Sequence, residues 1–361
     1  LEVPVESYRD RRQMAEKLRT HRQELAEAVT TEFLRRYPDW AVRYGDVARI
    51  RGIEDACHHI DFLAGAVEAG SPAAFEDYGR WTVALLAARG IAGHFVSENL
   101  EQIGRAIAPL LADTERPYVE AVVRAGCAGC CDGPPLGATQ LAGRDARQDN
   151  PLDLTRRLFV QAILGAQRKA ALNVALEAMR AGASPIDLYV DVFQEALYEI
   201  GRLWAANAIT VAREHMATAI AQFVISQLYS HLTVAETHRG RAIITGVEGE
   251  LHQIGANMVA DVLESRGWDV RFLGTQMPHQ GILDAVEDHQ ADLLGISVTM
   301  IFNLPQVARL LAALRLRFGA RTPRILLGGA AFRDAPALWQ ELGVGGCGRD
   351  LRQAIQLAEA S

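Results

Sequence analysis

The chain has 361 residues, of which 49% are hydrophobic and 22% are charged. This length is about two to three times that of a typical domain, and the composition is that of a globular protein, which excludes wholesale disorder, collagen and a disulfide-rich miniprotein. The net charge of -7 argues against a nucleic-acid-binding surface. No apolar run reaches the roughly 20 residues of a membrane span, and the N-terminal segment has no signal-peptide core, so we expect a cytoplasmic protein without membrane contact.

The first third of the chain has the periodicity of helices. Apolar residues recur at helical spacing from residue 7 to about 112, with short turn signals between the periodic segments. We therefore predict an all-helical domain over residues 1–125. The segment 126–150 is rich in glycine, proline and cysteine and has no periodicity, which predicts a linker.

Three of the five cysteines, Cys127, Cys130 and Cys131, lie in this predicted linker. Disulfides are not expected in a reducing compartment. A Cys-x-x-Cys-Cys motif could bind zinc, but a fourth ligand at a regular spacing is missing. A structural role fits the cysteines best, and a metal site, a redox role or covalent attachment of a chromophore are the alternatives.

The remaining part of the chain has two kinds of hydrophobic pattern, and the change between them falls near residue 239. Residues 151–238 contain helical segments whose breaks predict a four-helix bundle. From residue 239 to 361, short β-branched runs alternate with helical segments, which predicts a parallel sheet in a doubly wound, flavodoxin-like α/β domain. In such a fold, ligands bind at the carboxyl ends of the strands.

Polar and glycine residues follow three of the predicted strands. They form the segments Glu250-x-His252-x-x-Gly255, Ser297-x-Thr299 and Gly328-Gly329. A neutral imidazole is a good metal ligand, and a carboxylate two residues earlier is placed to hold its second nitrogen. The glycines allow the backbone to approach a ligand closely, and the small hydroxyls can donate hydrogen bonds to it.

The order and spacing of these segments resemble the Asp-x-His-x-x-Gly, Ser-x-Leu and Gly-Gly pattern of the cobalamin-binding family. Glu250 stands here for the usual Asp, and Thr299 for the usual Leu. The resemblance implies that His252 replaces the dimethylbenzimidazole base on the lower face of cobalt. It also implies that the displaced nucleotide tail lies in a groove beside the other motif residues. An ordinary flavodoxin-like domain with one loop histidine is the alternative.

A second motif precedes this domain. Trp204 ends one predicted helix, and Glu214 and His215 lie in the first turn of the next, which Thr210 can cap. Trp-x9-Glu-His resembles the adenosylcobalamin-dependent photoreceptors of the light-responsive transcription-regulator family. The resemblance implies that Trp204 covers the adenosyl group, with the acid and the histidine beside it, although a tryptophan at a helix end is also common in ordinary cores. Those regulators have a histidine after the Trp, whereas Ala205 here predicts a different light state.

The N-terminal helical domain lacks the Lys/Arg-rich recognition helix that DNA binding needs. In front of the Trp-x9-Glu-His and cobalamin segments, it resembles the photocobilins, which implies a non-covalent biliverdin. Such a tetrapyrrole needs cations, a polar group for its nitrogens, and apolar walls. The candidates are Arg49, Arg51, His58, His59, Asp61, Tyr78 and Trp81. A solvated helix face with one core histidine, or a haem ligated by His58 or His59, are the alternatives.

Together these patterns predict a light sensor and not an enzyme. Photolysis of adenosylcobalamin is expected to repack the helical cap and to change the oligomeric state, with biliverdin as second chromophore. The signal would then pass through assembly, a protein partner or a fused output domain. A corrinoid methyl-carrier protein of a methyltransferase system is the main alternative, and a cobalamin-responsive regulator without photochemistry is a third.

Overall fold

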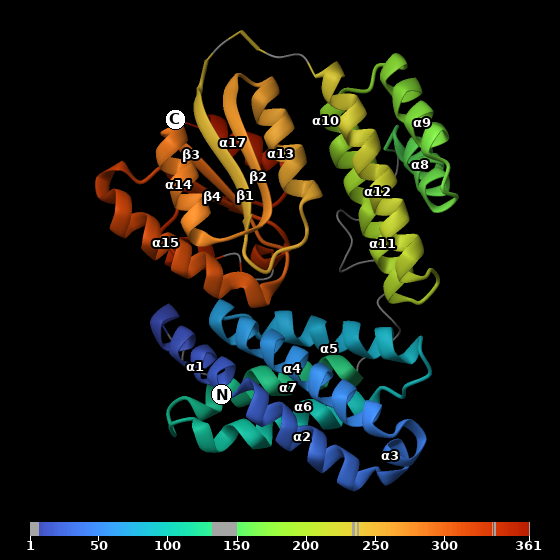
Figure 1. The fold of residues 1–361 in the computed structure, drawn as a ribbon, viewed down its shortest axis with the longest axis vertical. Helices are drawn as coiled ribbons and strands as arrows, with labels where there is room; N and C mark the ends of the chain where they lie inside the picture. The colour runs from blue at the N-terminus through green and yellow to red at the C-terminus, as the bar shows by residue number, and fades with distance from the viewer. Residues whose placement is uncertain are drawn as a thin grey trace. The chain divides into compact units, whose positions relative to one another are not determined.

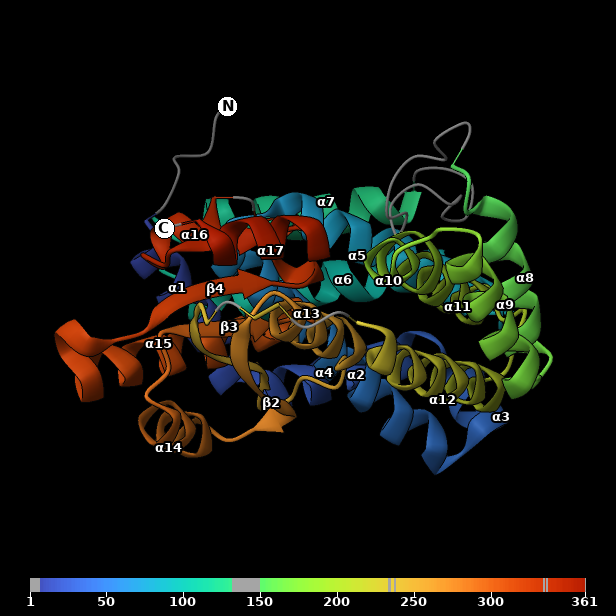
Figure 2. The same ribbon diagram turned by 90° about the horizontal axis from the view of Figure 1, so that it is seen from above.

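The computed structural model describes residues 7–131, 150–232, 235, 236, 238–333, 335 and 337–360 (Figures 1 and 2). The chain divides into two compact units. The first comprises Leu1–Leu136 with Asp334–Glu341, and the second comprises Gly137–Arg333 with Leu342–Ser361. Within the described part of the chain, no helix has both the length and the apolar character to cross a membrane.

The first unit is helical, as predicted. Its helices are α1 (Tyr8–Thr20), α2 (Arg22–Arg36), α3 (Pro38–Tyr44), α4 (Asp46–Ala69), α5 (Pro72–Ala87), α6 (His94–Ile107), α7 (Arg116–Cys131) and the short α16 (Leu338–Glu341). Local signals set their ends: Gly70 ends α4 in the left-handed conformation, and Ser71 then caps α5, because its hydroxyl accepts from the Ala74 N–H at 3.2 Å. The core contains fully buried side chains such as Met14, Ile60 and Phe75.

The predicted linker 126–150 begins too early, because α7 continues to Cys131. The small residues taken as linker signals are instead packing contacts of a helix. A Cβ on Gly129 would lie 2.0 Å from the Glu76 carbonyl oxygen, and one on Gly79 would lie 2.2 Å from that of Gly126. The glycines are therefore needed for the close approach of α5 and α7. Residues 132–149 lie outside the described part of the chain.

The second unit begins with the predicted four-helix bundle. Its elements are α8 (Asp153–Leu164), α9 (Arg168–Arg180), the continuous run of α10 (Pro185–Asp187), η2 (Leu188–Gln194) and α11 (Glu195–Ala205), then α12 (Val211–Leu228). The segment η2 is a π-helix. Phe159, Tyr189 and Phe193 are fully buried at the centre of the bundle. Met258 and Leu351 of the following α/β fold belong to the same apolar core.

The rest of the second unit is a five-stranded parallel sheet with the order β2-β1-β3-β4-β5. The strands are β1 (Gly240–Val247), β2 (Trp268–Met277), β3 (Leu293–Ser297), β4 (Arg324–Gly328) and β5 (Gly346–Gly348). The helices α13 (Ile254–Ser265) and α17 (Leu351–Glu359) cover one face, and α14 (His279–His289) and α15 (Leu304–Phe318) cover the other (Figure 1). This is the predicted doubly wound fold, with one strand, β5, that the sequence pattern did not predict.

Candidate functional site

The three motif segments meet at the carboxyl edge of the sheet. The strand pairing aligns Ser297 with Gly246 of β1 on one side and with Gly328 of β4 on the other. Glu250 and His252 follow β1, and Thr299 follows β3. Because all strands are parallel, these segments lie at one edge of the sheet, where doubly wound folds bind ligands.

Glu250 is the centre of this edge. Its side chain has no exposed surface, and Oε1 accepts hydrogen bonds from the N–H groups of Leu251 and His252, each at 3.0 Å. The other oxygen, Oε2, accepts from the N–H of Thr299 at 2.8 Å and from that of Met300 at 3.2 Å. Burial alone would raise the pKa of Glu250, but these hydrogen bonds and that from the His252 ring lower it to about 2. The carboxylate is therefore ionised, and it joins the loop after β1 to the loop after β3.

The same carboxylate orients His252. Its Nδ1 lies 2.6 Å from Glu250 Oε1, while 56% of the histidine side chain remains exposed. An ionised carboxylate can only accept, so Nδ1 is the ring nitrogen that donates to it, and Nε2 is the nitrogen left for a metal. This is the arrangement of a metal-ligating histidine with a carboxylate behind it. Glu250, although longer than the usual Asp, therefore still lies within hydrogen-bond distance of the histidine ring.

The motif glycines have two different functions. A Cβ on the exposed Gly255 would meet nothing within 4 Å, so the space beside it is open to a ligand. Gly329 has φ +97°, and a Cβ there would lie 2.2 Å from the Val298 carbonyl oxygen. The packing of its own loop therefore requires glycine at position 329.

Three residues that sequence reasoning missed also hold this edge. Asn303 is buried, and its Nδ2 donates to Glu250 Oε2 at 3.2 Å. Gln276, at the end of β2, accepts through its side chain from the Gly249 N–H at 2.9 Å. Gln276 has φ +59°, a strained conformation of the kind that clusters at functional sites. Gly249, at φ +85°, makes room for Asn303, whose Oδ1 would lie 2.7 Å from a Cβ at that position.

The cap motif lies at one end of the bundle. Trp204 is half-buried near the end of α11, against the bundle core. Thr210 caps α12 as predicted, because its hydroxyl accepts from the Arg213 N–H at 3.3 Å. In the first turns of α12, Glu214 pairs with His215 Nδ1 and accepts from the Thr218 hydroxyl at 3.0 Å. In Figure 1 the turn from α11 to α12 points in the same direction as the carboxyl ends of the strands.

Two of the three cysteines of α7, Cys127 and Cys130, are partly buried. Burial, followed by neighbouring charges, raises the pKa of Cys127 to about 11 and that of Cys130 to about 12. Both are therefore neutral thiols near pH 7. No cluster of three or more metal-ligating side chains occurs among the described residues.

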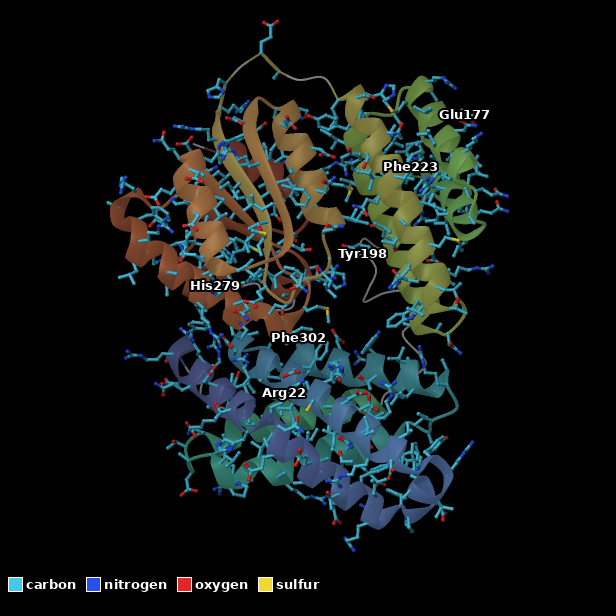
Figure 3. All side chains as sticks on the ribbon, viewed as in Figure 1. Arg22, Glu177, Tyr198, Phe223, His279 and Phe302 are labelled. Carbon is cyan, nitrogen blue, oxygen red and sulfur yellow. The ribbon has the colours of Figure 1, made fainter. Side chains whose placement is uncertain are left out.

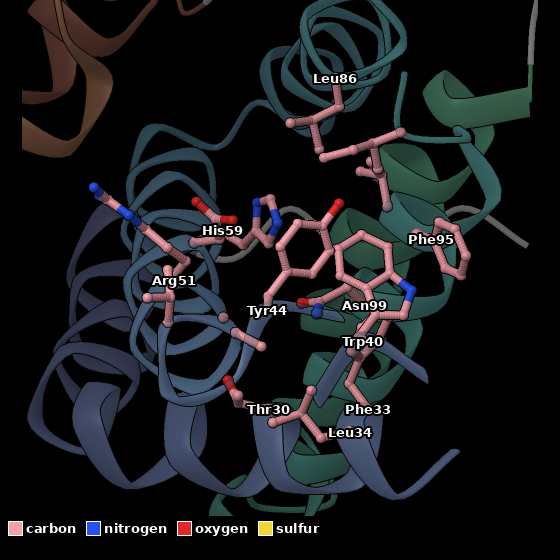
Figure 4. A pocket seen from close by; sticks show the side chains of 16 residues that line it. Thr30, Phe33, Leu34, Trp40, Tyr44, Arg51, His59, Leu86, Phe95 and Asn99 are labelled. Carbon is pink, nitrogen blue, oxygen red and sulfur yellow. The ribbon is translucent and has the colours of Figure 1, made fainter. Parts of the chain in front are cut away.

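The first unit contains a cavity of about 330 Å³, within the range of small-molecule sites (Figure 4). Residues of α2 to α6 surround it, and its aromatic wall includes Phe33, Trp40 and Phe95, whose ring centroids are 5.2–5.8 Å apart. Thr30 and Asn99 also line it. Their oxygens Oγ1 and Oδ1 are buried and have no hydrogen-bond partner within the described ranges. Such orphaned acceptors indicate a place for a ligand with N–H or O–H donors.

The structure brings two of the seven predicted bilin residues, Arg51 and His59, to this cavity. The others do not line it. Tyr78 lies behind His59 and is next to Trp81, with ring centroids 6.0 Å apart. The remaining three are engaged elsewhere or exposed: Arg49 donates to the Thr31 hydroxyl, Asp61 pairs with Arg22, and His58 is exposed.

His59 is the polar group at the back of the cavity. Its Nδ1 lies 2.7 Å from the Tyr78 hydroxyl, and only 6% of the residue is exposed. Burial, and then the charge of the neighbouring His58, lowers the pKa of His59 to about 4. The ring is therefore neutral near pH 7 and can present either a donor or an acceptor to a ligand, depending on its tautomer.

Two families of B12 binding domain match the second unit, one over residues 240–355 and the other over residues 155–229. Both the α/β fold and the bundle are thus of cobalamin-binding type. The monomethylamine corrinoid protein of Methanosarcina barkeri has the same fold, with a TM-score of 0.51 and 21% identity over 57% of this chain and 98% of that chain. The chain is therefore a cobalamin-binding protein.

Similar sequences come from proteins of different activity. The HTH-type transcriptional repressor CarH of Myxococcus xanthus is 28% identical over 207 residues, which are 57% of this chain and 68% of the repressor. The methionine synthase of Mycobacterium leprae is 24% identical over 179 residues, 48% of this chain. The matched region is only 15% of the synthase, so the likeness does not extend to the whole of that protein.

Proposed function

We propose that the chain is a light sensor, not an enzyme, and that it binds adenosylcobalamin between the carboxyl edge of the sheet and the end of the bundle. The observation that carries this proposal is the placement of Trp204 and the Glu214–His215 pair at the bundle end that points the same way as the His252 loop. The similarity to the CarH repressor supports it, because the cap motif resembles that of light-responsive regulators.

The residues of this chain fit the cofactor. His252 would hold cobalt from below through Nε2, with Glu250 fixing its orientation and the open space at Gly255 admitting the nucleotide tail. Trp204 would pack against the adenosyl group above. Adenosylcobalamin would supply a light-labile cobalt–carbon bond. Without the adenosyl group, Trp204 would lack its packing partner and the bundle would repack, and Ala205 would offer no replacement ligand.

We propose the cavity of the first unit as the site of the second chromophore, biliverdin. The walls of Trp40 and Phe95 fit flat conjugated rings, and the orphaned oxygens of Thr30 and Asn99 would accept from ring N–H groups. Arg51 would pair with a propionate. Biliverdin would supply absorption at red wavelengths. A haem held by His59 is the competing occupant, and its sharp absorption band distinguishes it.

The deciding experiment is the absorption spectrum of protein reconstituted with adenosylcobalamin and biliverdin, before and after green light. We expect an irreversible change in the corrin bands, a red band that survives desalting, and a shift in size-exclusion elution on illumination. Behaviour identical to that of the free cofactors in light would overturn the light-sensor proposal. Loss of the red band on desalting would remove biliverdin alone.

His252→Ala tests the lower face. We expect it to weaken cobalamin binding or to leave the cofactor with its own base bound, visible in the corrin spectrum. Because 56% of the His252 side chain is exposed, the variant should fold normally. An unchanged spectrum and affinity would show that His252 does not bind cobalt.

A corrinoid methyl carrier is the second candidate function. It is favoured by the fold shared with the monomethylamine corrinoid protein, 98% of which this chain covers. A carrier would accept a methyl group from a methyltransferase and its donor in the dark. Methyl transfer of that kind without any light response would establish the carrier in place of the sensor.

A further inference from the structure

A long helical run of the bundle makes polar contacts with the α/β fold, beside the apolar core that the two parts share. The elements α10, η2 and α11 follow one another without a break from Pro185 to Ala205. The π-helical segment η2 lies near the start of this run, and Trp204 lies near its end. Trp204 follows Tyr189 by 15 positions, so at 1.5 Å per residue the two are about 22 Å apart along the helix axis.

The polar contacts between the two parts gather around η2. Arg352 of α17 donates to Asp187 Oδ1 at 2.6 Å and to Asp191 Oδ2 at 3.0 Å. Tyr189 has no exposed surface, and its hydroxyl donates to Asp261 Oδ2 of α13 at 3.1 Å. Two helices of the α/β fold thus hold the same helical turn.

Nearer to Trp204, the helical run makes a weaker contact with the α/β fold. Tyr198 of α11 is labelled in Figure 3. Arg333 lies over its ring, with 5.7 Å from the guanidinium carbon to the ring centroid. Breaking a half-exposed cation–π contact requires less free energy than breaking the ion pairs of Arg352 with two carboxylates. The polar part of the attachment is therefore stronger at η2 than toward Trp204.

We propose that η2 is the pivot of the bundle: its contacts with α13 and α17 persist in both states, while the Trp204 end of α11 moves away from the sheet edge. This proposal rests on the light-driven repacking proposed above. A π-helix suits a pivot, because its wide turns are less stable than α-helix and can change locally. With the arm of about 22 Å, a rotation of about 15° displaces Trp204 by about 6 Å.

Covalent locks test the pivot in the full-length, adenosylcobalamin-loaded protein. In a Cys131→Ser background, which removes the exposed cysteine, one variant carries Asp187→Cys with Arg352→Cys and the other Tyr198→Cys with Arg333→Cys. A short bismaleimide joins each pair. We expect the lock at η2 to preserve the light-dependent shift in elution and the lock at Tyr198 to abolish it.

The matched control is each variant without the crosslinker. If the uncrosslinked protein responds to light and the η2 lock stops the response, the bundle leaves as a whole and the pivot is wrong. If both locks leave the response intact, the bundle does not turn and the pivot is also wrong.

A dark measurement separates this proposal from light sensing. Hydrogen–deuterium exchange of apo and cobalamin-loaded protein should show equal protection of η2 in both, with protection of the Trp204 end of α11 rising several-fold on loading. That pattern without any light response would overturn the light sensor and keep the pivot. An equal change at η2 and at the Trp204 end would overturn the pivot, whatever the light response.

Discussion

Two histidines, one in each unit, are held in similar ways and offer different chemistry. Both His252 and His59 have Nδ1 within 2.7 Å of an oxygen on another side chain. The partner of His252 is the ionised carboxylate of Glu250, and the partner of His59 is the hydroxyl of Tyr78. His252 is more than half exposed, whereas only 6% of His59 is exposed.

The difference shows how the partner of one ring nitrogen determines the use of the other. A carboxylate accepts the proton of Nδ1, so Nε2 is the nitrogen of His252 that is left to bind a metal. A hydroxyl can donate or accept, so the Nε2 of His59 can serve a bilin N–H or C=O group, or the iron of a haem. The two histidines thus differ in the hydrogen-bond partner that determines which atoms their second ring nitrogen can meet.

The largest effect is expected from Glu250→Ala. The change leaves the buried donors around Glu250 without their acceptor, and each unsatisfied donor costs about 1–3 kcal/mol. We expect the free energy of unfolding of the second unit, measured in urea, to be about 4 kcal/mol lower in the variant. This is less than the sum over all the donors, because water will hydrate some of them. The neighbouring, exposed Glu248→Ala is the matched control and should change stability by less than about 0.5 kcal/mol. Equal effects of the two variants would show that Glu250 does not organise this edge.

The second effect is a pH dependence carried by His59. Its pKa is lowered from 6.5 to about 4 in the folded chain, so between these values the unfolded chain binds more protons. The contribution of the neutral His59 to the free energy of unfolding is fully present above pH 6.5. It is lost as the pH falls from 6.5 through 4, and the total loss is about 3 kcal/mol. His59→Gln should remove this part of the acid destabilisation, measured by urea unfolding at pH 7, 5.5 and 4. The exposed neighbour His58→Gln should retain most of it, and a His59→Gln profile parallel to the unmodified one would contradict the assignment.

Tyr78→Phe tests the other half of the same pair. The variant keeps the stacking of residue 78 on Phe62, where the ring centroids are 4.0 Å apart, and removes only the hydroxyl. A buried Nδ1 then lacks its partner, so we expect a loss of about 2 kcal/mol in the first unit. Tyr44→Phe, at a ring that is 43% exposed, should have almost no effect. A loss equally small for Tyr78→Phe would show that water satisfies His59 instead.

The sequence predicted the parts of the site that are local. The alternation of strands and helices, the His252 loop and the Thr210 cap each depend on residues within a few positions of one another. Neighbouring residues interact in nearly every structure that contains the motif, so their pattern is informative. For the same reason the helices of the first unit were predicted correctly.

The parts that were missed depend on contacts between distant segments. Asn303 reaches Glu250 across 53 positions, and nothing in its own neighbourhood marks it. The strand Gly346–Gly348 has no β-branched residue and is defined by its pairing with β4. The glycines of α7 resemble a linker until α5 packs against them. The cavity takes its aromatic wall from separate helices, whereas sequence reasoning gathered cations that were close along the chain.

The smallest effect is expected at Asn303, and it tests the contact of this residue with Glu250. Asn303→Ala removes one of six donors to Glu250 and leaves the backbone donors in place, so we expect a loss of about 1 kcal/mol. Combining it with Glu250→Gln in a double-mutant cycle isolates the contact, since both residues belong to one network. A coupling near zero would mean that Asn303 only supports Gly249, beside which its Oδ1 lies. A coupling of about 1 kcal/mol would show that Glu250 draws the η4 segment (Ile301–Asn303) and the His252 loop into one rigid edge, as a fixed metal ligand requires.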